Sequence, residues 1–530
     1  MRGFGRRGRA ALCAVALVAA PASAVLLTAT AAGAVTVTVD NTGDPAVGNP
    51  ANCPAVPAGT CTLRDAIAAT DTGAADTVSI TVGPISLSQG VLLHTMPTAL
   101  TIEGNGNSVV QTTAASLLLT FGPLTVDGLV ASAPTNMLNA FGPVSVSGST
   151  LTATTGTGVV SFGGGTSLTV TGSTISSPAV AANAAQDVTV TDSTVSSSAG
   201  PGVVAAAGNA VVDSSSVTGA AGGVGAGTNA TVTASEITSS GGQAVLAGVG
   251  GRASVDGSVV NGQGGGVQAG LEVTITGSTI TSGGGLGAFV TSGTVTAESS
   301  SISGGNLAVG ANTGVVATNT ELTGGASVGV VTNNGTVTLT GSTVTGGAMF
   351  GVKAPAGVDA VNSTISGNSG CGLLSPNGHV TLVYATVAEN GAGGCGSNVS
   401  AATLESFASV VALQSPNCVV GTTVSHGFNR SDDATCGFTD PTDQTGANPL
   451  LGALADNGGP TLTRATQVTS PLIDAIPTAQ CSADGASTVV PLVDQRGDTR
   501  PSGGGCDIGA VELQAAVTTP AVILTPRFTG

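Results

Sequence analysis

Residues 168–176 spell LTVTGSTIS, and the same phrase returns as VTVTDSTVS from Val188, VTITGSTIT from Val273 and VTLTGSTVT from Val337, with a weaker VDAVNSTIS from Val358. Apolar and polar residues alternate inside each phrase, which is the pattern of a β-strand with one buried and one exposed face. Runs rich in Gly, Ala and Ser separate the phrases. The region from Thr150 to Asn390 is therefore predicted to be a series of short strands.

The apolar residue after the Ser/Thr pair of each phrase measures the repeat. These markers are Leu151, Ile175, Val195, Val217, Ile237, Val259, Ile280, Ile302, Leu322, Val344, Ile365 and Val387. After a first interval of 24, successive markers lie 20 to 22 residues apart, and such a period is typical of a solenoid. The units lack the Leu and Asn pattern of leucine-rich repeats, so three short strands per turn predict an all-β, single-stranded parallel β-helix. Leu129 and Val109 extend the rhythm to roughly 13–14 coils, a rod on the order of 60–65 Å long at the usual strand spacing.

The composition agrees with a narrow solenoid core. Glycine accounts for 82 of 530 residues, aromatic residues for 2% and charged residues for 8%, and tryptophan is absent. Stacked Val, Ile, Leu and Ala fill such a core without bulky side chains. Disorder is the alternative for a chain with so few charges, but the regular apolar rows and a mean hydropathy of +0.41 argue against it.

The first 34 residues have the pattern of an export signal. Arg2, Arg6, Arg7 and Arg9 precede an apolar stretch over 10–20, and small residues offer cleavage after Ala24 or after Ala34. No later segment is long and apolar enough to span a membrane. The sequence therefore predicts a secreted or cell-surface protein outside the cytoplasm.

Charge and cysteine content fit that location. After removal of the signal, 29 acidic residues face 8 basic ones, a net charge of −21, which disfavours nucleic acid as a partner. Eight cysteines remain and lie in neighbouring pairs: Cys53/Cys61, Cys371/Cys395, Cys418/Cys436 and Cys481/Cys506. In an oxidising compartment these are disulfide candidates. Metal binding is the alternative, although no paired C-x-x-C spacing accompanies them.

A short amphipathic helix is predicted within CTLRDAIAAT, residues 61–70, as a cap over the open end of the solenoid. Thr62 and Asp65 have the spacing of a capping box. Leu63, Ala66 and Ile67 form one apolar face. The neighbouring Arg64 and Asp65 are interpreted as a local ion pair rather than as a binding pair.

Both ends of the chain resemble secreted bacterial β-helix proteins. CTLRDAI is similar to their CSLREA motif, and NPLLGALADNGGPTLTRA (448–465), SPLIDA (470–475), DQRGDTRP (494–501) and CDIGAVEL (506–513) resemble the choice-of-anchor Q domain. The resemblance implies a right-handed, pectin-lyase-like β-helix that is exported or displayed at the cell surface, without an established catalytic activity. The tail QAAVTTPAVILTPRFTG lacks a sortase motif followed by a membrane span, which favours free secretion. The expected divisions are 1–34 signal peptide, 35–110 cap and first coils, 111–412 repeats, 413–513 charged end piece and 514–530 tail.

A glycan lyase or hydrolase would need convergent carboxylates on neighbouring coils. Relative to the markers, acids at equal positions are Asp192 with Asp256, Asp213 with Glu298, and Glu236 with Glu321. By this alignment the members of each pair lie three or four coils apart, on the order of 15–20 Å, beyond the separation of about 6.5–9.5 Å that an inverting enzyme uses. No aromatic sugar platform is evident. The sequence thus leans away from an enzyme and predicts no catalytic or cofactor residue.

Three further patterns remain open. The Thr-x-Thr pairs, such as Thr169/Thr171 and Thr274/Thr276, resemble an ice-binding array, but Val211/Asp213, Asp256 and Asp359/Val361 interrupt it. Asp456, Asp484 and Asp498 beside Gly or Asn are turn carboxylates that would suit Ca²⁺ at best weakly. Arg496-Gly497-Asp498 is interpreted as structural.

The leading hypothesis is a non-enzymatic exported structural or adhesin-like β-helix. The first alternative is a polysaccharide-binding or polysaccharide-degrading β-helix, and the second alternative is an ice-binding surface.

Overall fold

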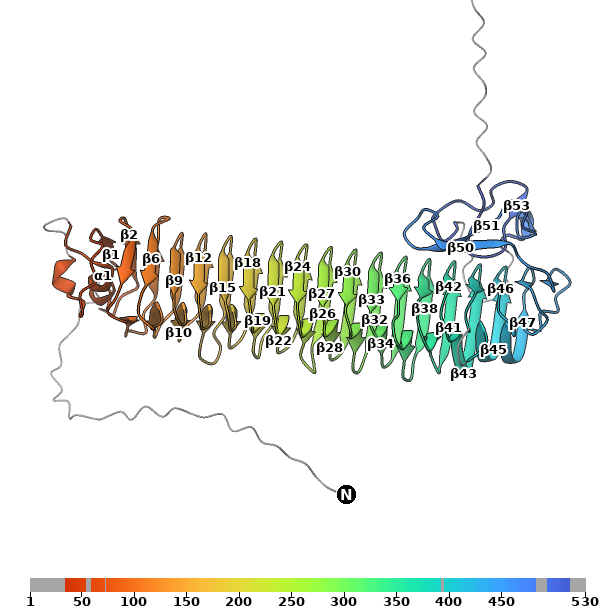
Figure 1. Ribbon diagram of the computed structural model, residues 1–530, viewed down its shortest axis with the longest axis horizontal. Helices are drawn as coiled ribbons and strands as arrows, with labels where there is room; N and C mark the ends of the chain where they lie inside the picture. Colours follow the sequence, from red (N-terminus) through yellow and green to blue (C-terminus); the bar gives the residue numbers. More distant parts are fainter. Residues whose placement is uncertain (1–33, 54–58, 72, 392–394, 483–492, 515–530) are drawn as a thin grey trace, which may run out of the picture.

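The computed structural model describes residues 34–53, 59–71, 73–391, 395–482 and 493–514. The chain winds into a right-handed parallel β-helix of about 16 turns, which forms one straight rod (Figure 1). The predicted fold class is confirmed. The count of 13–14 coils is wrong, because regular turns begin at Thr36 and continue to Gln444, on either side of the marked repeats. At about 4.8 Å per turn the rod is on the order of 75 Å long.

Apart from the first and last turns, each turn contributes one strand to each of three parallel sheets. The first sheet contains β1 (Thr36–Val39), β2 (Asp76–Ile80), β5 (Leu100–Glu103), β8 (Leu124–Asp127), β11 (Val144–Ser147), β14 (Leu168–Thr171), β17 (Val188–Thr191), β20 (Ala210–Asp213), β23 (Ala230–Thr233), β26 (Arg252–Asp256), β29 (Glu272–Thr276), β32 (Thr294–Glu298), β35 (Gly314–Thr318), β38 (Thr336–Thr340) and β41 (Gly357–Val361). The second contains β3 (Ile85–Leu87), β6 (Ser108–Gln111), β9 (Val130–Ala133), β12 (Thr150–Ala153), β15 (Thr174–Ser177), β18 (Thr194–Ser197), β21 (Ser216–Gly219), β24 (Glu236–Ser239), β27 (Val259–Gly262), β30 (Thr279–Ser282), β33 (Ser301–Gly304), β36 (Glu321–Thr323), β39 (Thr343–Thr345), β42 (Thr364–Ser366), β44 (Thr386–Ala388), β46 (Val410–Ala412), β48 (Arg430–Ser431) and β49 (Gln444–Thr445).

The third sheet contains β4 (Leu92–His94), β7 (Leu118–Thr120), β10 (Leu138–Ala140), β13 (Val159–Ser161), β16 (Ala182–Ala184), β19 (Pro201–Ala205), β22 (Gly222–Ala226), β25 (Gln243–Ala247), β28 (Gly265–Ala269), β31 (Leu286–Val290), β34 (Leu307–Ala311), β37 (Val328–Thr332) and β40 (Phe350–Lys353). In the last turns the longer strands β43 (Cys371–Val383), β45 (Val399–Phe407) and β47 (Cys418–Ser425) pass through the third sheet and then the first.

The repeated phrase is the corner between the first and second sheets. In LTVTGSTIS, β14 supplies LTVT, β15 supplies TIS with Ser177, and Gly172 turns the chain at φ +55°. Asp192 takes the same left-handed conformation one turn later, at φ +50°. Left-handed backbone favours Gly, Asn and Asp, which accounts for the residue types at the fifth position of the phrase.

The predicted marker Val259 is one residue too early, and the inward residue of that phrase is Val260. Ile237 pairs with Val260, which in turn pairs with Ile280. Val260 is fully buried, whereas Val259 is 43% exposed. The doubled valine in GSVVNG hid this shift, because two apolar residues follow Ser258.

A ladder of buried serines lines the same corner. Each serine hydroxyl donates to the carbonyl oxygen two residues earlier and accepts the backbone N–H of the corresponding residue one turn before, which is a serine except for Leu129 and Thr320. Ser235, for example, donates to Thr233 O at 2.6 Å and accepts from Ser215 N at 3.0 Å. The ladder comprises Ser149, Ser173, Ser193, Ser215, Ser235, Ser258, Ser278 and Ser300, and resumes with Ser342 and Ser363. The serine of the repeat is therefore an internal structural residue.

Removing one rung is expected to destabilise the rod locally. Ser235→Ala leaves the Ser215 N–H buried without its acceptor, a cost of about 1–3 kcal/mol. Ser254→Ala in the next turn removes an exposed hydroxyl of the first sheet and serves as the control. Denaturant unfolding of both variants measures the difference. Equal stability of the two would contradict a structural role for the ladder.

The N-terminal end of the rod is covered by α1 (Leu63–Ala69), as predicted. The Thr62 hydroxyl accepts from Asp65 N, and the Asp65 carboxylate accepts in return from Thr62 N, which makes a complete capping box. Leu63, Ala66 and Ile67 are buried against the core. The expected Arg64–Asp65 pair is wrong: Arg64 binds Asp44 at 2.7 Å, while Asp65 accepts hydrogen bonds from Asn49 and Asn52.

Acid is expected to loosen this cap. Burial raises the pKa of Asp65, but hydrogen bonds from Asn49, Asn52 and Thr62 outweigh it and leave the pKa below the ordinary value of 3.8. The stability that this carboxylate supplies is complete above about pH 4 and is lost as the pH falls through the folded pKa. Hydrogen exchange of residues 59–71 at pH 6 and below pH 3 measures it. Loss of protection at the low pH in the wild type but an unchanged profile in Asp65→Asn is the expected result.

The C-terminal residues 449–482 and 493–513 fold back onto the second sheet near its downstream end (Figure 1). This end piece contains β50 (Leu451–Ala455) paired with β51 (Thr463–Thr466), and β52 (Ile476–Pro477) paired with β53 (Gly505–Cys506). Polar contacts hold it to the rod: Arg464 binds Ser366 and Glu389, and Ala510 N donates to the Thr386 hydroxyl. A second apolar cluster, which includes Tyr384, Phe407 and Ile508, fills the space beneath it.

Four disulfides close local loops: Cys53–Cys61, Cys371–Cys395, Cys418–Cys436 and Cys481–Cys506. The short helices η1 (Pro50–Asn52) and η2 (Thr478–Gln480) adjoin the first and the last of these. Among the described residues, no helix has the length and apolar character that crossing a bilayer requires. The predicted signal over residues 1–34 and the tail over 514–530 lie almost wholly outside the described residues.

Candidate functional site

The carboxylates of the first sheet are better aligned than the sequence suggested. Glu103 and Asp127 are direct partners on adjacent strands. Asp213, Asp256 and Glu298 share one row, separated by single threonines on the strands between them. Neighbours in this row therefore lie two strands apart, about 10 Å. The predicted separation of three or four coils is wrong for neighbours in this row. The apolar residue that pairs with Ile237 and Ile280 is Val260, so Asp256 has the same position in its turn as Asp213 and Glu298.

These rows do not form a catalytic cleft. A glycosidase needs one carboxyl held protonated by an apolar, enclosed site beside a second that stays ionised. Asp127 and Asp256 are exposed on a flat sheet face, and Asp127 already accepts the Ser147 hydroxyl at 2.6 Å. The carboxylates are thus suitably spaced, but no enclosed apolar site holds one of them protonated while its neighbour stays ionised. The structure assigns no catalytic pair here.

Hollowed surface is found at the corner between the first and second sheets, where Asp192 and Glu236 line a shallow hollow of about 370 Å³, and on the second sheet itself. One shallow cavity of about 340 Å³ is lined by Ser176, Ser196 and Thr218 with their following residues, and a second of about 330 Å³ by Thr238, Asn261 and Thr281 with theirs. Thr218 pairs directly with Thr238. The two cavities are therefore consecutive parts of one groove along the rod, here named the hydroxyl groove: the row Ser176, Ser196, Thr218, Thr238, Asn261 and Thr281 with the residues that adjoin it.

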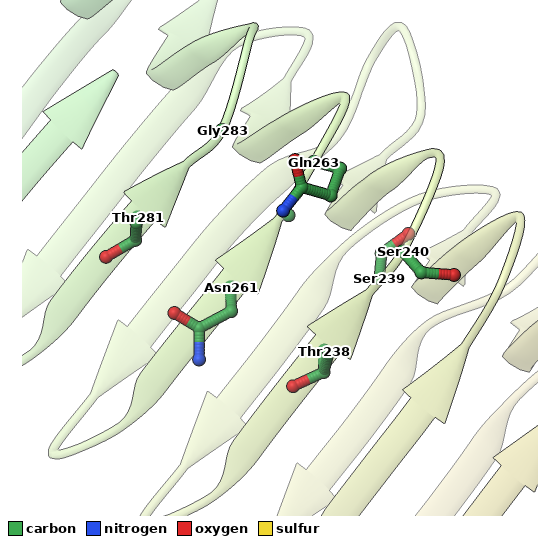
Figure 2. Close-up of a pocket in the computed structure, with 8 residues that line it drawn as sticks. Thr238, Ser239, Ser240, Asn261, Gln263, Thr281 and Gly283 are labelled. Atoms are coloured by element: carbon green, nitrogen blue, oxygen red, sulfur yellow. The ribbon is translucent and has the colours of Figure 1, made fainter. Parts of the chain in front are cut away.

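The hydroxyl groove presents free neutral hydrogen-bonding groups. Figure 2 shows Thr238, Asn261 and Thr281 projecting side by side from three neighbouring strands, with Gln263 above them. The β-sheet spaces these side chains about 4.8 Å apart. Gly283 leaves room for the Gln263 amide, since a Cβ there would meet the amide oxygen. Hydroxyls and amides both donate and accept, so the row can bind a chain of hydroxyl groups in either role.

No pair of carboxylates faces the groove at catalytic distance within the described residues. Glu236 and Glu321 lie in the row beside it, as the sequence predicted, and four strand steps separate them, about 19 Å. That spacing is about twice the upper inverting distance. Glu236 and Glu321 are therefore too far apart to act as an inverting pair.

The end piece closes the downstream end of the groove. The Thr343 hydroxyl donates to Leu462 O, and Gln495 Nε2 donates to Thr343. Burial raises the pKa of Glu321, and the nearby Asp456 adds to the rise. Beyond β36 the row is thus covered, and the open length lies upstream.

The remaining predicted residues have structural partners. Asp456 accepts from Gly458 N, and Asp498 pairs with Arg496, which also binds Asp494. Asp484 lies outside the described residues. No three His, Cys, Asp or Glu side chains gather as a metal site in the described part of the chain. The Arg-Gly-Asp triplet is thereby part of an ion-paired turn.

The sequence did not predict the hydroxyl groove, because no charged or aromatic residue lines it. Its signal was present one residue after each marker, where Thr, Ser or Asn recurs from Thr152 to Thr281. Those residues are ordinary for an exposed strand. Only the depth of the surface distinguishes their row from the Thr rows of the first sheet.

The fold defines the class of protein, a parallel β-helix, and its second sheet carries one long neutral groove. The sequence matches the family described as right-handed beta helix region over residues 178–312 and 223–360. No curated protein matches it.

Two solved structures are similar. Tailspike protein 3 of bacteriophage CBA120 aligns with TM-score 0.33 and 11% identity over 69% of this chain and 57% of its own, so this chain spans less than two thirds of it. Pectate lyase Pel9A aligns with TM-score 0.19 and 13% identity over 91% of this chain and 97% of its own. Both TM-scores are below 0.5, and neither likeness carries information on ligand or activity.

Proposed function

We propose that this protein is an exported, non-enzymatic β-helix that binds a neutral polysaccharide along the hydroxyl groove. The observation that supports this function is the continuous outward row of hydroxyl and amide groups from Ser176 to Thr281, of which Ser176 already donates to Thr152 Oγ1 at 3.2 Å. A linear glycan offers hydroxyls along its whole length, and a straight groove of repeating donors and acceptors matches such a ligand. Four disulfides fit an extracellular location.

Charge selects neutral over acidic glycans. The chain carries a formal net charge of −17, and no basic side chain lines either cavity of the groove. An acidic polymer such as a polyuronate would meet repulsion without a compensating cation. The resulting role is that of a surface or matrix component that holds glycan, which joins the adhesin-like and the polysaccharide-binding hypotheses.

Binding is expected to weaken when groove hydroxyls are removed. The triple variant Thr218→Ala/Thr238→Ala/Thr281→Ala deletes three hydrogen-bonding groups at about 1 kcal/mol each, so affinity should fall on the order of 100-fold. The matched control Thr189→Ala/Thr231→Ala/Thr274→Ala removes three hydroxyls from the first sheet. Affinity electrophoresis in gels with neutral glucans, mannans and polyuronate provides the measurement.

Two outcomes of that experiment contradict the proposal. Equal retardation of both triple variants would place the glycan on another surface. New reducing ends or unsaturated sugars could appear when the wild type is incubated with glycan. If every groove variant still produced them, the protein would have a catalytic centre elsewhere.

Ice binding is not proposed for the first sheet. Its threonine rows do stack as predicted, and Thr169, Thr189 and Thr231 belong to one of them. The neighbouring row carries Asp213, Asp256 and also Glu298. Protruding charged side chains on alternate strands break the flat, uniform surface that such a role requires.

A further inference from the structure

The corners between the second and third sheets alternate in length along the hydroxyl groove. The inward residue Val203 of the third sheet lies eight positions after Val195 of the second, but in the next turn Val224 lies only seven positions after Val217. Long and short corners alternate in this way through the turns whose inward second-sheet residues are Leu151, Ile175, Val195, Val217, Ile237, Val260, Ile280, Ile302 and Leu322. The groove therefore has a structural period of two turns, about 9.6 Å.

Serine and glycine alternate at the residue that begins each corner. Ser239 begins a long corner, and its Oγ accepts from Gly242 N at 3.1 Å, which holds the longer loop in a turn. Gly262 begins a short corner, where a Cβ would collide with the carbonyl oxygen of Gly265. The two kinds of corner thus need different residues, and the paired row supplies them in turn: Ser197, Gly219, Ser239, Gly262, Ser282 and Gly304.

Each cavity of the hydroxyl groove includes a short corner with a long corner on either side. In the downstream cavity, Gln263 of the short corner lies between Ser240 and Gly283 of the two long corners (Figure 2). Pro178 has the corresponding position in the upstream cavity. A short corner has one residue fewer and so extends less far from the rod. The alternation therefore places a recess beside every second turn of the groove.

A buried hydroxyl in the upstream recess is left for a ligand. Ser177 lines the cavity of about 340 Å³ and is 5% exposed, and its Oγ has no hydrogen-bond partner among the described residues. Buried polar groups are almost always hydrogen-bonded, because a buried hydroxyl without a partner is unfavourable. A hydroxyl group of a ligand seated in this recess would supply the missing partner.

A two-turn period matches one class of glycan. In an extended 1,4-β-linked chain each sugar is turned over relative to the one before, so the chain repeats at every second sugar. The length of one sugar is close to the strand step of about 4.8 Å, so neighbouring groove residues such as Thr218 and Thr238 can each meet one sugar. Along either edge of this ribbon a hydroxymethyl group projects at every second sugar, which is the spacing of the recesses. Chains with 1,4-α or 1,3-β linkages curve into helices and do not present this straight edge.

We propose that the ligand of the hydroxyl groove is a 1,4-β-linked hexose polymer bound as a flat ribbon. One disaccharide lies along each pair of turns, with every second hydroxymethyl group in a recess at a short corner. This inference rests on the proposed function, because it names the glycan that binds the same groove. Eight strand steps separate Leu151 from Leu322, about 38 Å, so the alternating stretch accommodates about eight sugars.

Calorimetric titration with three hexasaccharides of glucose that differ only in linkage tests the proposal. The 1,4-β-linked hexaose is expected to bind at least about tenfold more tightly than the 1,4-α-linked and the 1,3-β-linked hexaoses. Equal affinity for all three, lost in the triple variant Thr218→Ala/Thr238→Ala/Thr281→Ala, would overturn the ribbon and leave glycan binding in the groove intact. If the triple variant weakened binding of no hexaose, glucan or mannan, the proposed function itself would fail and the ribbon with it.

A matched pair of variants tests the recess. Ala220 follows Gly219 in a short corner, at the position that Pro178 and Gln263 hold in the two cavities. A hexaose must cross this turn, because the alternating stretch has only three turns upstream of it and five downstream. Ala220→Phe fills the recess and is expected to weaken binding of the 1,4-β-linked hexaose at least about tenfold by steric exclusion. Ala199→Phe places the same side chain on the exposed long corner one turn earlier, outside both cavity linings, and should leave the affinity unchanged. Equal affinity of the two variants would overturn the placement of the ribbon in the recesses.

Discussion

Replacing Arg500 by methionine is expected to detach the C-terminal end piece from the rod, at a cost of about 3–5 kcal/mol. The guanidinium is 2% exposed, binds the fully buried Glu512 at 2.8 Å and donates to the carbonyl oxygens of Asp507 and Gly509. It also lies 4.3 Å over the ring of Tyr384, a residue of the rod. Methionine has similar bulk but no charge, so the buried Glu512 would lose its cation and keep the N–H donors of Ser502 and Asp507.

The pH dependence of this defect identifies its cause. Burial raises the pKa of Glu512, and Arg500 opposes that rise. Without Arg500 the folded pKa of Glu512 rises further. The folded variant therefore takes up a proton more readily than the unfolded chain, so its stability relative to wild type should fall as the pH increases through that pKa and recover in acid. The double variant Arg500→Met/Glu512→Gln removes the stranded charge and should recover part of the loss at neutral pH.

Hydrogen exchange of residues 449–513, measured beside that of residues 150–300, shows whether the release is local. Arg252→Met is the control, because Arg252 and Glu272 are 64% and 44% exposed and an exposed pair contributes little. If Arg252→Met and Arg500→Met changed the protection of the end piece equally, the buried Arg500–Glu512 pair would not be the contact that holds the end piece to the rod.

The sequence predicted those parts of the molecule that repeat. Strict alternation located the strands, and the period located the turns, since both follow directly from the pleat of a strand and the pitch of a solenoid. The capping box at Thr62 and Asp65 was also predictable, because its partners are three residues apart. Local spacing was sufficient wherever the interaction was local.

Contacts between distant residues were not predictable in the same way. Arg64 binds Asp44, 20 residues away, rather than its neighbour. Arg464 reaches Ser366, and Gln495 reaches Ser342, across 98 and 153 residues. The position of the end piece, and with it the closed end of the hydroxyl groove, depends on such pairs. The spacing of residues in a single sequence does not indicate which distant residues pair.

The inward serines show a second limit. Alternation assigns polar residues to solvent, yet Ser173, Ser193 and Ser235 are buried at the corner between sheets. A corner interrupts the period of two, and the backbone groups exposed by the turn need a partner that adjacent strands do not supply. Polar residues are selected there by hydrogen bonding, and hydrophobicity alone does not distinguish them from exposed ones.

Asn398→Ala is expected to produce the other large loss of stability, about 3–5 kcal/mol, because one side chain satisfies several buried groups. Asn368, Asn390, Asn398 and Asn417 are all buried and form a continuous amide ladder in the last turns. Asn398 Nδ2 donates to Ala412 O and to Asn417 Oδ1, and its Oδ1 accepts from the backbone and side-chain nitrogens of Asn390. Alanine leaves these buried donors and acceptors without the partner that Asn398 supplies.

A matched control separates this effect from the loss of any asparagine. Asn333 is exposed in the turn after β37, so Asn333→Ala should change the unfolding midpoint little. Asn398→Asp tests the ladder further, since a carboxylate can still accept from Asn390 but cannot donate to Ala412 O. It should be destabilised at neutral pH and partly recover in acid, where the protonated carboxyl can donate once. Calorimetric unfolding in which Asn398→Ala and Asn333→Ala have the same midpoint would show that the ladder adds nothing to the rod, and that the apolar stack alone closes its downstream turns.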